Sequence, residues 1–283
     1  MDTANIIGID LGATNIRGAS VKNNLPSAIV SRRIKSDGSV EDVLNDIFWV
    51  VDQLIDLTVK AIGIGVPSVV DVAEGIVYDV QHIPSWKEVH LKSIMQARYN
   101  IPVFVNNDAN CFALGEYYFG KGIGTDSLVG LTLGTGLGAG IIANKKLYSG
   151  FNCGAGEIGF FEYLGNNLEF YSSGSFFQNV HQQDGLQVYQ AAQRGEASAL
   201  KLYAELGTHI GEAIKITMYA YDPQVIVMGG SVSQAYEFFE HSMWAQVKTF
   251  AYQKSVERIR IEISGLENSG ILGAAALYYD AAQ

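Results

Sequence analysis

The feature that most constrains this chain is a glycine-rich segment that occurs twice. The first copy runs from Ile7 to Ala19 and the second from Val129 to Ile141. Aligned without a gap, the copies match at Gly8 and Gly130, Leu11 and Leu133, Gly12 and Gly134, Gly18 and Gly140, and further on at Leu25 and Leu147. Each copy has the pattern strand, tight turn, strand. We therefore expect two like-folded halves facing each other across a cleft, with the bare amides of both turns cradling a polyphosphate.

Strand and helix patterns alternate along the rest of the chain. The predicted strands are Ile6–Leu11, Ile16–Val21, Val59–Val66, Ile76–Val80, Val103–Val105, a hairpin in Leu128–Ile142, Val225–Met228 and Ile259–Ile263. One predicted helix begins at Ser39, with Asp42 as its capping-box partner. Two further helices are predicted over Ala197–Tyr221 and Ser269–Asp280. The stretch from Gly150 to Gly174 is predicted to be an irregular loop. This alternation indicates an α/β protein with largely covered sheets.

Composition narrows the class of protein. The chain has 283 residues, of which 48% are hydrophobic and 17% charged, as in a globular protein. A net charge of −10 argues against nucleic acid or an anionic membrane as the main partner. Cys111 and Cys153 are too few for a disulfide framework and lack zinc-site spacing. With no signal peptide or membrane helix in the pattern, we expect a cytoplasmic protein.

The two turns supply candidate phosphate and metal groups. In the first, Asp10 ends a buried strand and can hold Mg²⁺ through water, while Gly12, Ala13 and Thr14 offer amides and a hydroxyl to a phosphate. In the second, Thr135 is the side chain best placed for a phosphate. The neighbouring glycines that let the backbone come close are Gly134, Gly136 and Gly138. The competing interpretation is two ordinary hairpins whose glycines only serve the turns.

Asp108 lies between a predicted strand and a predicted helix. A carboxylate at such a strand end can accept the proton of a substrate hydroxyl as that hydroxyl attacks phosphorus. The position equally suits a helix N-cap.

Two further acids and a glycine pair complete the set of candidates. Glu157 and Glu169, with Asn107, would form a site for the hydroxyls of a polyol. The competing interpretation is that both are surface acids exposed to solvent. Gly229 and Gly230 follow a strand and precede a helix. This position suits an adenosine that lies against bare backbone, and it is equally typical of a plain turn without a ligand.

Together these motifs resemble the ROK family of sugar kinases (repressors, open reading frames and kinases) in the actin/hexokinase/Hsp70 ATPase superfamily. The most specific segments are Gly8–Thr14, Asn107–Glu116, Leu133–Gly138 and Gly154–Gly159. The resemblance implies a two-lobed, ribonuclease H-like actin fold with a central cleft. The sugar and phosphate lobe would span 1–115, with the terminal helix 268–283 packing back on it, and the nucleotide lobe would span 116–267.

The resemblance also implies roles for individual residues. Asp108 would be the catalytic base that deprotonates a hexose hydroxyl, usually O6, and Asp10 would organise Mg²⁺. The sugar-binding residues would be Asn107, Glu157, Glu169, Gly156 and Gln81, the last at a position where the family often has a sugar-contacting Asn. The ATP phosphates and adenosine would contact Asp10, Gly12, Ala13, Thr14, Asn15, Gly134, Thr135, Gly136, Gly138, Gly229 and Gly230.

Two positions depart from the family pattern. Phe160 stands where members typically have a His that contacts both sugar and a structural zinc, and Phe161–Leu168 replaces the usual zinc-binding cysteine run. We therefore expect no structural zinc, and a loop held by packing of Phe160, Phe161, Tyr163 and Phe170.

The leading hypothesis is an ATP- and Mg²⁺-dependent hexose kinase, expected to be a homodimer. A repressor is disfavoured because repressors of the family carry an extra N-terminal helix-turn-helix segment, whereas this chain enters its first strand by Ile6. A sugar- or nucleotide-binding protein without turnover, acting as a regulator or sensor, is the alternative. The sequence leaves the sugar open among glucose, N-acetylglucosamine, mannose, N-acetylmannosamine, fructose and allose.

Overall fold

The computed structural model describes residues 4–12, 14–80 and 82–282, so the candidates Ala13 and Gln81 lie outside the described residues. The chain forms two compact units. The first contains Met1–Gly124, Gly140–Ala155 and Gly265–Gln283, and the second contains Thr125–Ala139 and Gly156–Ser264. The lobe boundaries expected from the sequence stay a prediction.

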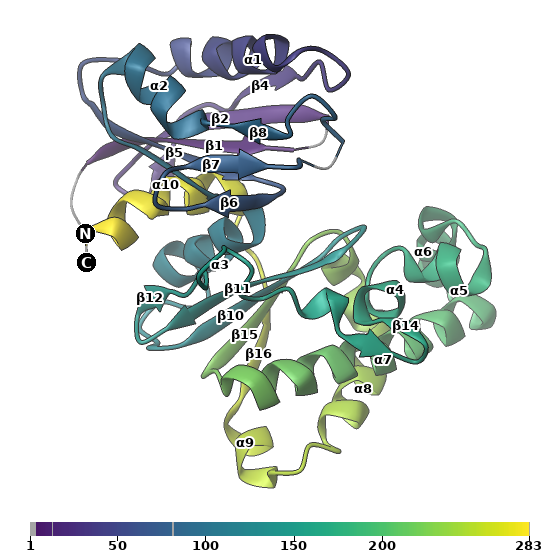
Figure 1. Ribbon diagram of the computed structural model, residues 1–283. Coiled ribbons are helices and arrows are strands. Elements are labelled where there is room, and N and C mark those ends of the chain that lie inside the picture. Colours follow the sequence, from purple (N-terminus) through teal and green to yellow (C-terminus); the bar gives the residue numbers. More distant parts are fainter. Residues whose placement is uncertain (1–3, 13, 81, 283) are drawn as a thin grey trace. The chain divides into compact units, whose positions relative to one another are not determined.

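A mixed sheet forms the centre of the first unit, with the strand order β3-β2-β1-β5-β9 and β4 also paired with β2 (Figure 1). Its strands are β1 (Asn5–Leu11), β2 (Asn15–Lys22), β3 (Leu25–Pro26), β4 (Val30–Arg33), β5 (Val59–Val66) and β9 (Val103–Asn107). The predicted hairpin is confirmed, because β1 and β2 pair antiparallel from Ile6 opposite Val21 to Leu11 opposite Ile16. Strands β5 and β9 then continue the sheet in parallel.

The second large sheet repeats this plan, with the order β12-β11-β10-β15-β16. Its strands are β10 (Leu128–Leu133), β11 (Leu137–Ala143), β12 (Lys146–Leu147), β15 (Val225–Gly229) and β16 (Arg260–Ile263). Strands β10 and β11 form the second predicted hairpin, and β15 and β16 follow in parallel. The match of Leu25 with Leu147 is also explained, since these residues lie on the equivalent edge strands β3 and β12. The predicted α/β class with duplicated hairpins is therefore confirmed.

Helices cover the sheet of the first unit. They are α1 (Val40–Asp52), α2 (Leu91–Tyr99), α3 (Asp108–Phe119) and α10 (Ser269–Ala281), with a small sheet of β6 (Val69–Asp71), β7 (Ile76–Tyr78) and β8 (Glu88–Val89). Helix α10, yellow in Figure 1, lies directly against β1 and β5. A Cβ built on Gly8 or Gly63 would overlap a carbonyl oxygen of α10, so this close approach requires glycine on both strands.

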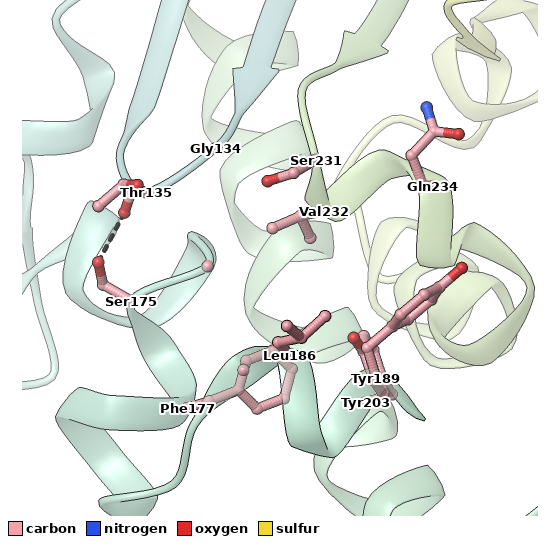
Figure 2. A pocket seen from close by; sticks show the side chains of 12 residues that line it. Gly134, Thr135, Ser175, Phe177, Leu186, Tyr189, Tyr203, Ser231, Val232 and Gln234 are labelled. Atoms are coloured by element: carbon pink, nitrogen blue, oxygen red, sulfur yellow. Dashed lines mark hydrogen bonds between the residues drawn. The ribbon is translucent and has the colours of Figure 1, made fainter. Parts of the chain in front are cut away.

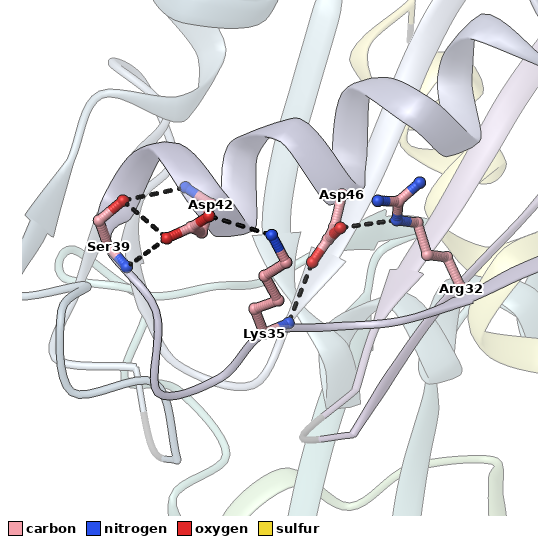
Figure 3. Close-up of polar contacts among 5 residues, drawn as sticks. All are labelled: Arg32, Lys35, Ser39, Asp42 and Asp46. Carbon is pink, nitrogen blue, oxygen red and sulfur yellow. Dashed lines mark hydrogen bonds and ion pairs between the residues drawn. The ribbon is translucent and has the colours of Figure 1, made fainter.

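Helix α1 is fixed at its start and in its middle (Figure 3). The predicted capping box between Ser39 and Asp42 is confirmed. Asp46, in the middle of the helix, is buried and accepts hydrogen bonds from Arg32 Nε at 2.6 Å and from the backbone N–H of Lys35 at 3.0 Å. These bonds fasten α1 to β4 and to the segment that follows it.

The second unit contains the remaining elements. They are η1 (Ile158–Phe160), β13 (Glu162–Tyr163), β14 (Asn166–Asn167), α4 (Leu168–Ser172), α5 (Phe176–His181), α6 (Gly185–Gln193), α7 (Ala197–Tyr221), η2 (Val232–Ala235), α8 (Tyr236–Val247) and α9 (Gln253–Arg258). The predicted bounds of α7 are confirmed. The prediction of an irregular loop from Gly150 to Gly174 is wrong in its second half, which forms η1, the β13–β14 hairpin and α4. Among the described residues, no helix is both long and apolar enough to cross a membrane.

Candidate active site

Asp108 is the first residue of α3 and comes directly after β9. Its side chain is exposed, and its Oδ1 accepts the backbone N–H of Ala109 at 2.8 Å. The alternative that Asp108 is the N-cap is wrong, because Asn107 has that role and accepts the N–H groups of Ala109 and Asn110. The first turn of a helix favours a negative charge. The fold therefore presents an ionisable carboxylate to solvent at the end of a parallel strand.

A buried network beneath Asp108 was not anticipated from the sequence. Asn106 Oδ1 accepts from the backbone N–H of Asn107, from Asn110 Nδ2 and from Cys153 Sγ. Asn107 Nδ2 in turn donates to the carbonyl oxygen of Ser68 at 3.2 Å. These bonds fix the start of α3. The three asparagines that surround Asp108, at 106, 107 and 110, are the signal that could have indicated them.

Asp10 is the penultimate residue of β1 and lies beside the first turn of α10. A Cβ built on Gly270 would lie 2.9 Å from Asp10 Cγ, which places the carboxylate against the N-terminus of that helix. Burial raises the pKa of Asp10, and the charge of Arg17 offsets part of that rise. A cation stabilises a carboxylate that burial makes harder to ionise, so Asp10 fits a role in holding Mg²⁺. Among the described residues, no group of three or more His, Cys, Asp or Glu side chains could hold a metal.

The first glycine turn is closed by its own backbone and supported by the segment after β4. The N–H of Gly12 donates to the carbonyl oxygen of Asn15 at 3.0 Å, and the N–H of Ile34 donates to that of Thr14 at 3.0 Å. The side chains of Thr14 and Asn15 are exposed. Their hydroxyl and amide are therefore available to a ligand.

The second glycine turn, in the second unit, is held from outside at three points. Leu137 N–H donates to Glu169 Oε2 at 2.8 Å, and Gly174 N–H donates to the carbonyl oxygen of Gly134 at 2.7 Å. Ser175 Oγ donates to the carbonyl oxygen of Thr135 at 2.7 Å, the dashed line in Figure 2. None of these bonds uses the backbone N–H of Thr135 or Gly136.

A pocket of about 620 Å³ adjoins this turn (Figure 2). Its lining is Gly134, Thr135, Gly174, Ser175, Phe177, Gly185, Leu186, Tyr189, Tyr203, Ser231, Val232 and Gln234. All twelve are uncharged, and five have large apolar or aromatic side chains. Such a pocket suits a flat, neutral ring system whose polar part reaches the turn.

The sequence indicated only one edge of this pocket. Gly134 and Thr135 line it as candidates, and Ser231 follows the candidate Gly230, while Gly229 is buried in β15. Its aromatic walls come from α5, α6 and α7, which carry no motif. No signal in the sequence brings these helices together.

Glu157 and Glu169 lie close enough in the second unit to interact through their charges. Burial raises the pKa of Glu157, and the negative charge of Glu169 raises it further. Gly156 precedes Glu157 with φ of 96°, and a Cβ there would overlap the carbonyl oxygen of Ala139, so this position requires glycine.

The expectation that four aromatic side chains hold the neighbouring loop is wrong for Phe160 and Phe161, which are 65% and 47% exposed. It is confirmed for Tyr163, whose hydroxyl lies 3.1 Å from His209 Nδ1 on α7 and whose ring meets Tyr171 edge-on. Phe170 extends this cluster through its contact with Tyr171.

Known proteins share this fold, and about a quarter of the aligned residues are identical in the three that follow. The glucokinase of Thermotoga maritima is 26% identical over 313 residues that cover 98% of each chain, and the xylose repressor of Bacillus subtilis is 27% identical over 97% of this chain and 77% of its own. The structure of a ROK glucokinase from Streptomyces griseus with glucose and AMPPNP superposes with a TM-score of 0.80 and 26% identity over 97% of this chain and 99% of that one. The fold is the actin-like ATPase fold, as predicted. The ROK family model matches residues 6–281, and the chain therefore belongs to the ROK family.

Proposed function

We propose that this protein is an ATP-dependent sugar kinase that transfers the γ-phosphate to the 6-hydroxyl of a hexose or N-acetylhexosamine. The observation that carries the proposal is the uncharged, aromatic-walled pocket next to the second glycine turn. A nucleoside fits such a pocket, and the turn offers backbone amides to the phosphates. The relative from Streptomyces griseus was solved with glucose and an ATP analogue, which supports the same pair of ligands here.

In this proposal the first unit supplies the base and the metal carboxylate. Asp108 accepts the proton of the sugar hydroxyl as that oxygen attacks the γ-phosphorus. Asn107 donates its second amide hydrogen to a sugar oxygen, while the first binds the Ser68 carbonyl and the side-chain oxygen caps α3. Mg²⁺ held by Asp10, with water between, would neutralise phosphate charge in the transition state. Gly12, Thr14 and Asn15 contact phosphate.

The second unit supplies the nucleotide pocket and two sugar-binding acids. Gly134, Thr135, Gly136 and Gly138 approach the phosphates, and Gly229 and Gly230 approach the nucleoside. Glu157 and Glu169 accept hydrogen bonds from sugar hydroxyls, with Gly156 allowing the chain to turn toward the ligand. Because the positions that would fix the sugar's identity differ from other members at Phe160, the proposal extends to a class of sugars and not to one.

Release of ADP with Mg-ATP and a panel of hexoses and N-acetylhexosamines tests this proposal. We expect sugar-dependent turnover that falls by more than about a hundredfold in Asp108→Asn, the size of a general-base effect. Asp37→Asn, the same change at an exposed aspartate of the first unit, is the matched control and should stay within about twofold. Equal rates in both variants would rule out Asp108 as the base.

A sugar-binding regulator is the second candidate function. The xylose repressor of Bacillus subtilis is about as similar in sequence as the glucokinase of Thermotoga maritima, so a regulator that binds sugar without turnover is an alternative to the kinase. Calorimetry separates the two functions. Sugar binding without ADP release for any sugar would support the regulator and contradict the kinase.

A further inference from the structure

The segment from α4 to the start of α5 acts as a clamp on the second glycine turn. Glu169, Gly174 and Ser175 bond to Leu137, Gly134 and Thr135 respectively, so three residues of this segment hold the turn. Two of these bonds involve only backbone or a serine hydroxyl. The bond from Glu169 is different because its acceptor is a carboxylate, and charge-assisted bonds are stronger than neutral ones.

Glu169 fits the turn closely. A Cβ built on Gly136 would lie only 2.5 Å from Glu169 Oε2, so the carboxylate fills the space that a side chain at 136 would need. A Cβ on Gly159 would lie 3.3 Å from Glu169 Cβ and 3.7 Å from Glu169 Oε2, so the backbone of Gly159 also approaches this side chain closely. The Glu169 side chain therefore packs against glycine backbone at both Gly136 and Gly159.

The remaining oxygen of this carboxylate has a different environment. Oε2 is the atom bonded to Leu137, and within the described part of the chain the structure shows no hydrogen bond to Oε1. The side chain is half-buried, and its charge acts on Glu157. One oxygen thus supports the phosphate turn, while the other can accept from a ligand hydroxyl beside Glu157.

We propose that Glu169 is a positioning residue for the nucleotide-binding turn and that, through this one carboxylate, sugar binding and nucleotide binding strengthen each other. The inference rests on the proposed function and names a regulation of the same site. A hydroxyl bound to Oε1 restricts the carboxylate to the position in which Oε2 holds the Leu137 N–H. That restriction orders the turn before nucleotide arrives, and linkage requires the nucleotide to raise sugar affinity by the same factor.

The test measures the affinity for Mg-ADP by calorimetry, first without any sugar. Glu169→Ala removes the acceptor and should weaken Mg-ADP binding at least about fivefold, the lower end of typical coupling. Glu169→Gln keeps an oxygen that accepts from Leu137 N–H and should restore most of this affinity. Glu162→Ala is the matched control, because Glu162 is an exposed acid on β13 of the same unit and has no part in the proposed site. Its Mg-ADP affinity without sugar should equal that of the native protein.

Amide hydrogen exchange supplies the second readout. The Leu137 amide should exchange faster in Glu169→Ala and at the native rate in Glu162→Ala. This pattern would tie any loss of affinity to the turn and not to general unfolding. Titrations repeated with a bound sugar should show tighter Mg-ADP binding in the native protein and no such gain in Glu169→Ala.

The outcomes separate this inference from the proposed function. Native Mg-ADP affinity in Glu169→Ala, or an unchanged Leu137 amide, would overturn the positioning role even if the protein is a kinase. The predicted order of affinities among the three variants, found together with a complete lack of sugar-dependent ADP release, would support the positioning role and contradict the kinase.

Discussion

The buried pair of Arg32 and Asp46 allows a quantitative test of what holds the first unit together. The side chain of Asp46 is 2% exposed and that of Arg32 is 34% exposed, and their bond joins α1 to β4 (Figure 3). Removing one member of a buried pair costs about 3–5 kcal/mol because the other charge stays uncompensated. Here Arg32 is partly exposed, and Asp46 keeps its bond to the N–H of Lys35. We therefore expect Arg32→Met to lower the free energy of unfolding by about 2.5 kcal/mol.

The double-mutant cycle follows from the same contacts. Asp46→Ala removes the buried charge but leaves the Lys35 N–H without its acceptor, at a cost of about 2 kcal/mol. Once Asp46 is absent, Arg32→Met should add only about 0.5 kcal/mol, so the coupling energy is about 2 kcal/mol. Methionine is chosen because it keeps an unbranched apolar stem where Arg32 packs over the ring of Trp49.

The assay must report on the first unit, since a chain of two compact units need not unfold in one step. Trp49 and Trp86 lie in the first unit and Trp244 in the second. Urea unfolding followed by tryptophan fluorescence in a Trp244→Phe background therefore follows the first unit alone. Arg33→Met, at an exposed arginine on the same strand, is the control and should change stability by less than about 0.5 kcal/mol. A coupling energy below about 0.5 kcal/mol would refute the reasoning that the pair acts as a unit.

Two further predictions concern the close approach of α10 and the ionisation of Glu157. Gly63→Ala should destabilise the protein by about 3 kcal/mol in thermal unfolding, because the new Cβ overlaps the carbonyl oxygen of Ala274, whereas Gly265→Ala meets no atom within 4 Å and should be near neutral. Since burial and Glu169 raise the pKa of Glu157 above its ordinary value of 4.5, the ionised form costs stability at neutral pH, and that cost vanishes as the pH falls below 4.5. Glu157→Gln should accordingly raise the melting temperature at pH 7 and leave it unchanged at pH 4, and an equal rise at both values would contradict the assigned cause.

Local sequence patterns located most elements because their determinants are local. The capping box at Ser39 and Asp42, the bounds of α7 and both hairpins follow from side-chain spacing and turn chemistry that neighbouring residues supply. The β13–β14 hairpin escaped prediction because its anchor, His209, lies on α7, far from it in the chain.

The candidate site was also predicted only where its determinants are local. Asp10, Asp108 and both turns lie at the ends of predicted strands, so the sequence pattern and the family resemblance indicated them. Which residue caps α3 depended on backbone geometry that makes Asn107, and not Asp108, the N-cap.

By itself, the sequence determined that two copies of one hairpin would each begin a sheet of the same strand order, because the repeated glycines and apolar residues act within each copy. Only the tertiary structure decided what each turn rests on. A carboxylate from α4 supports the second turn, and helices α5, α6 and α7 form the walls of the pocket beside it. Those contacts join residues far apart in the chain, and they depend on packing distances that no pattern within one segment encodes.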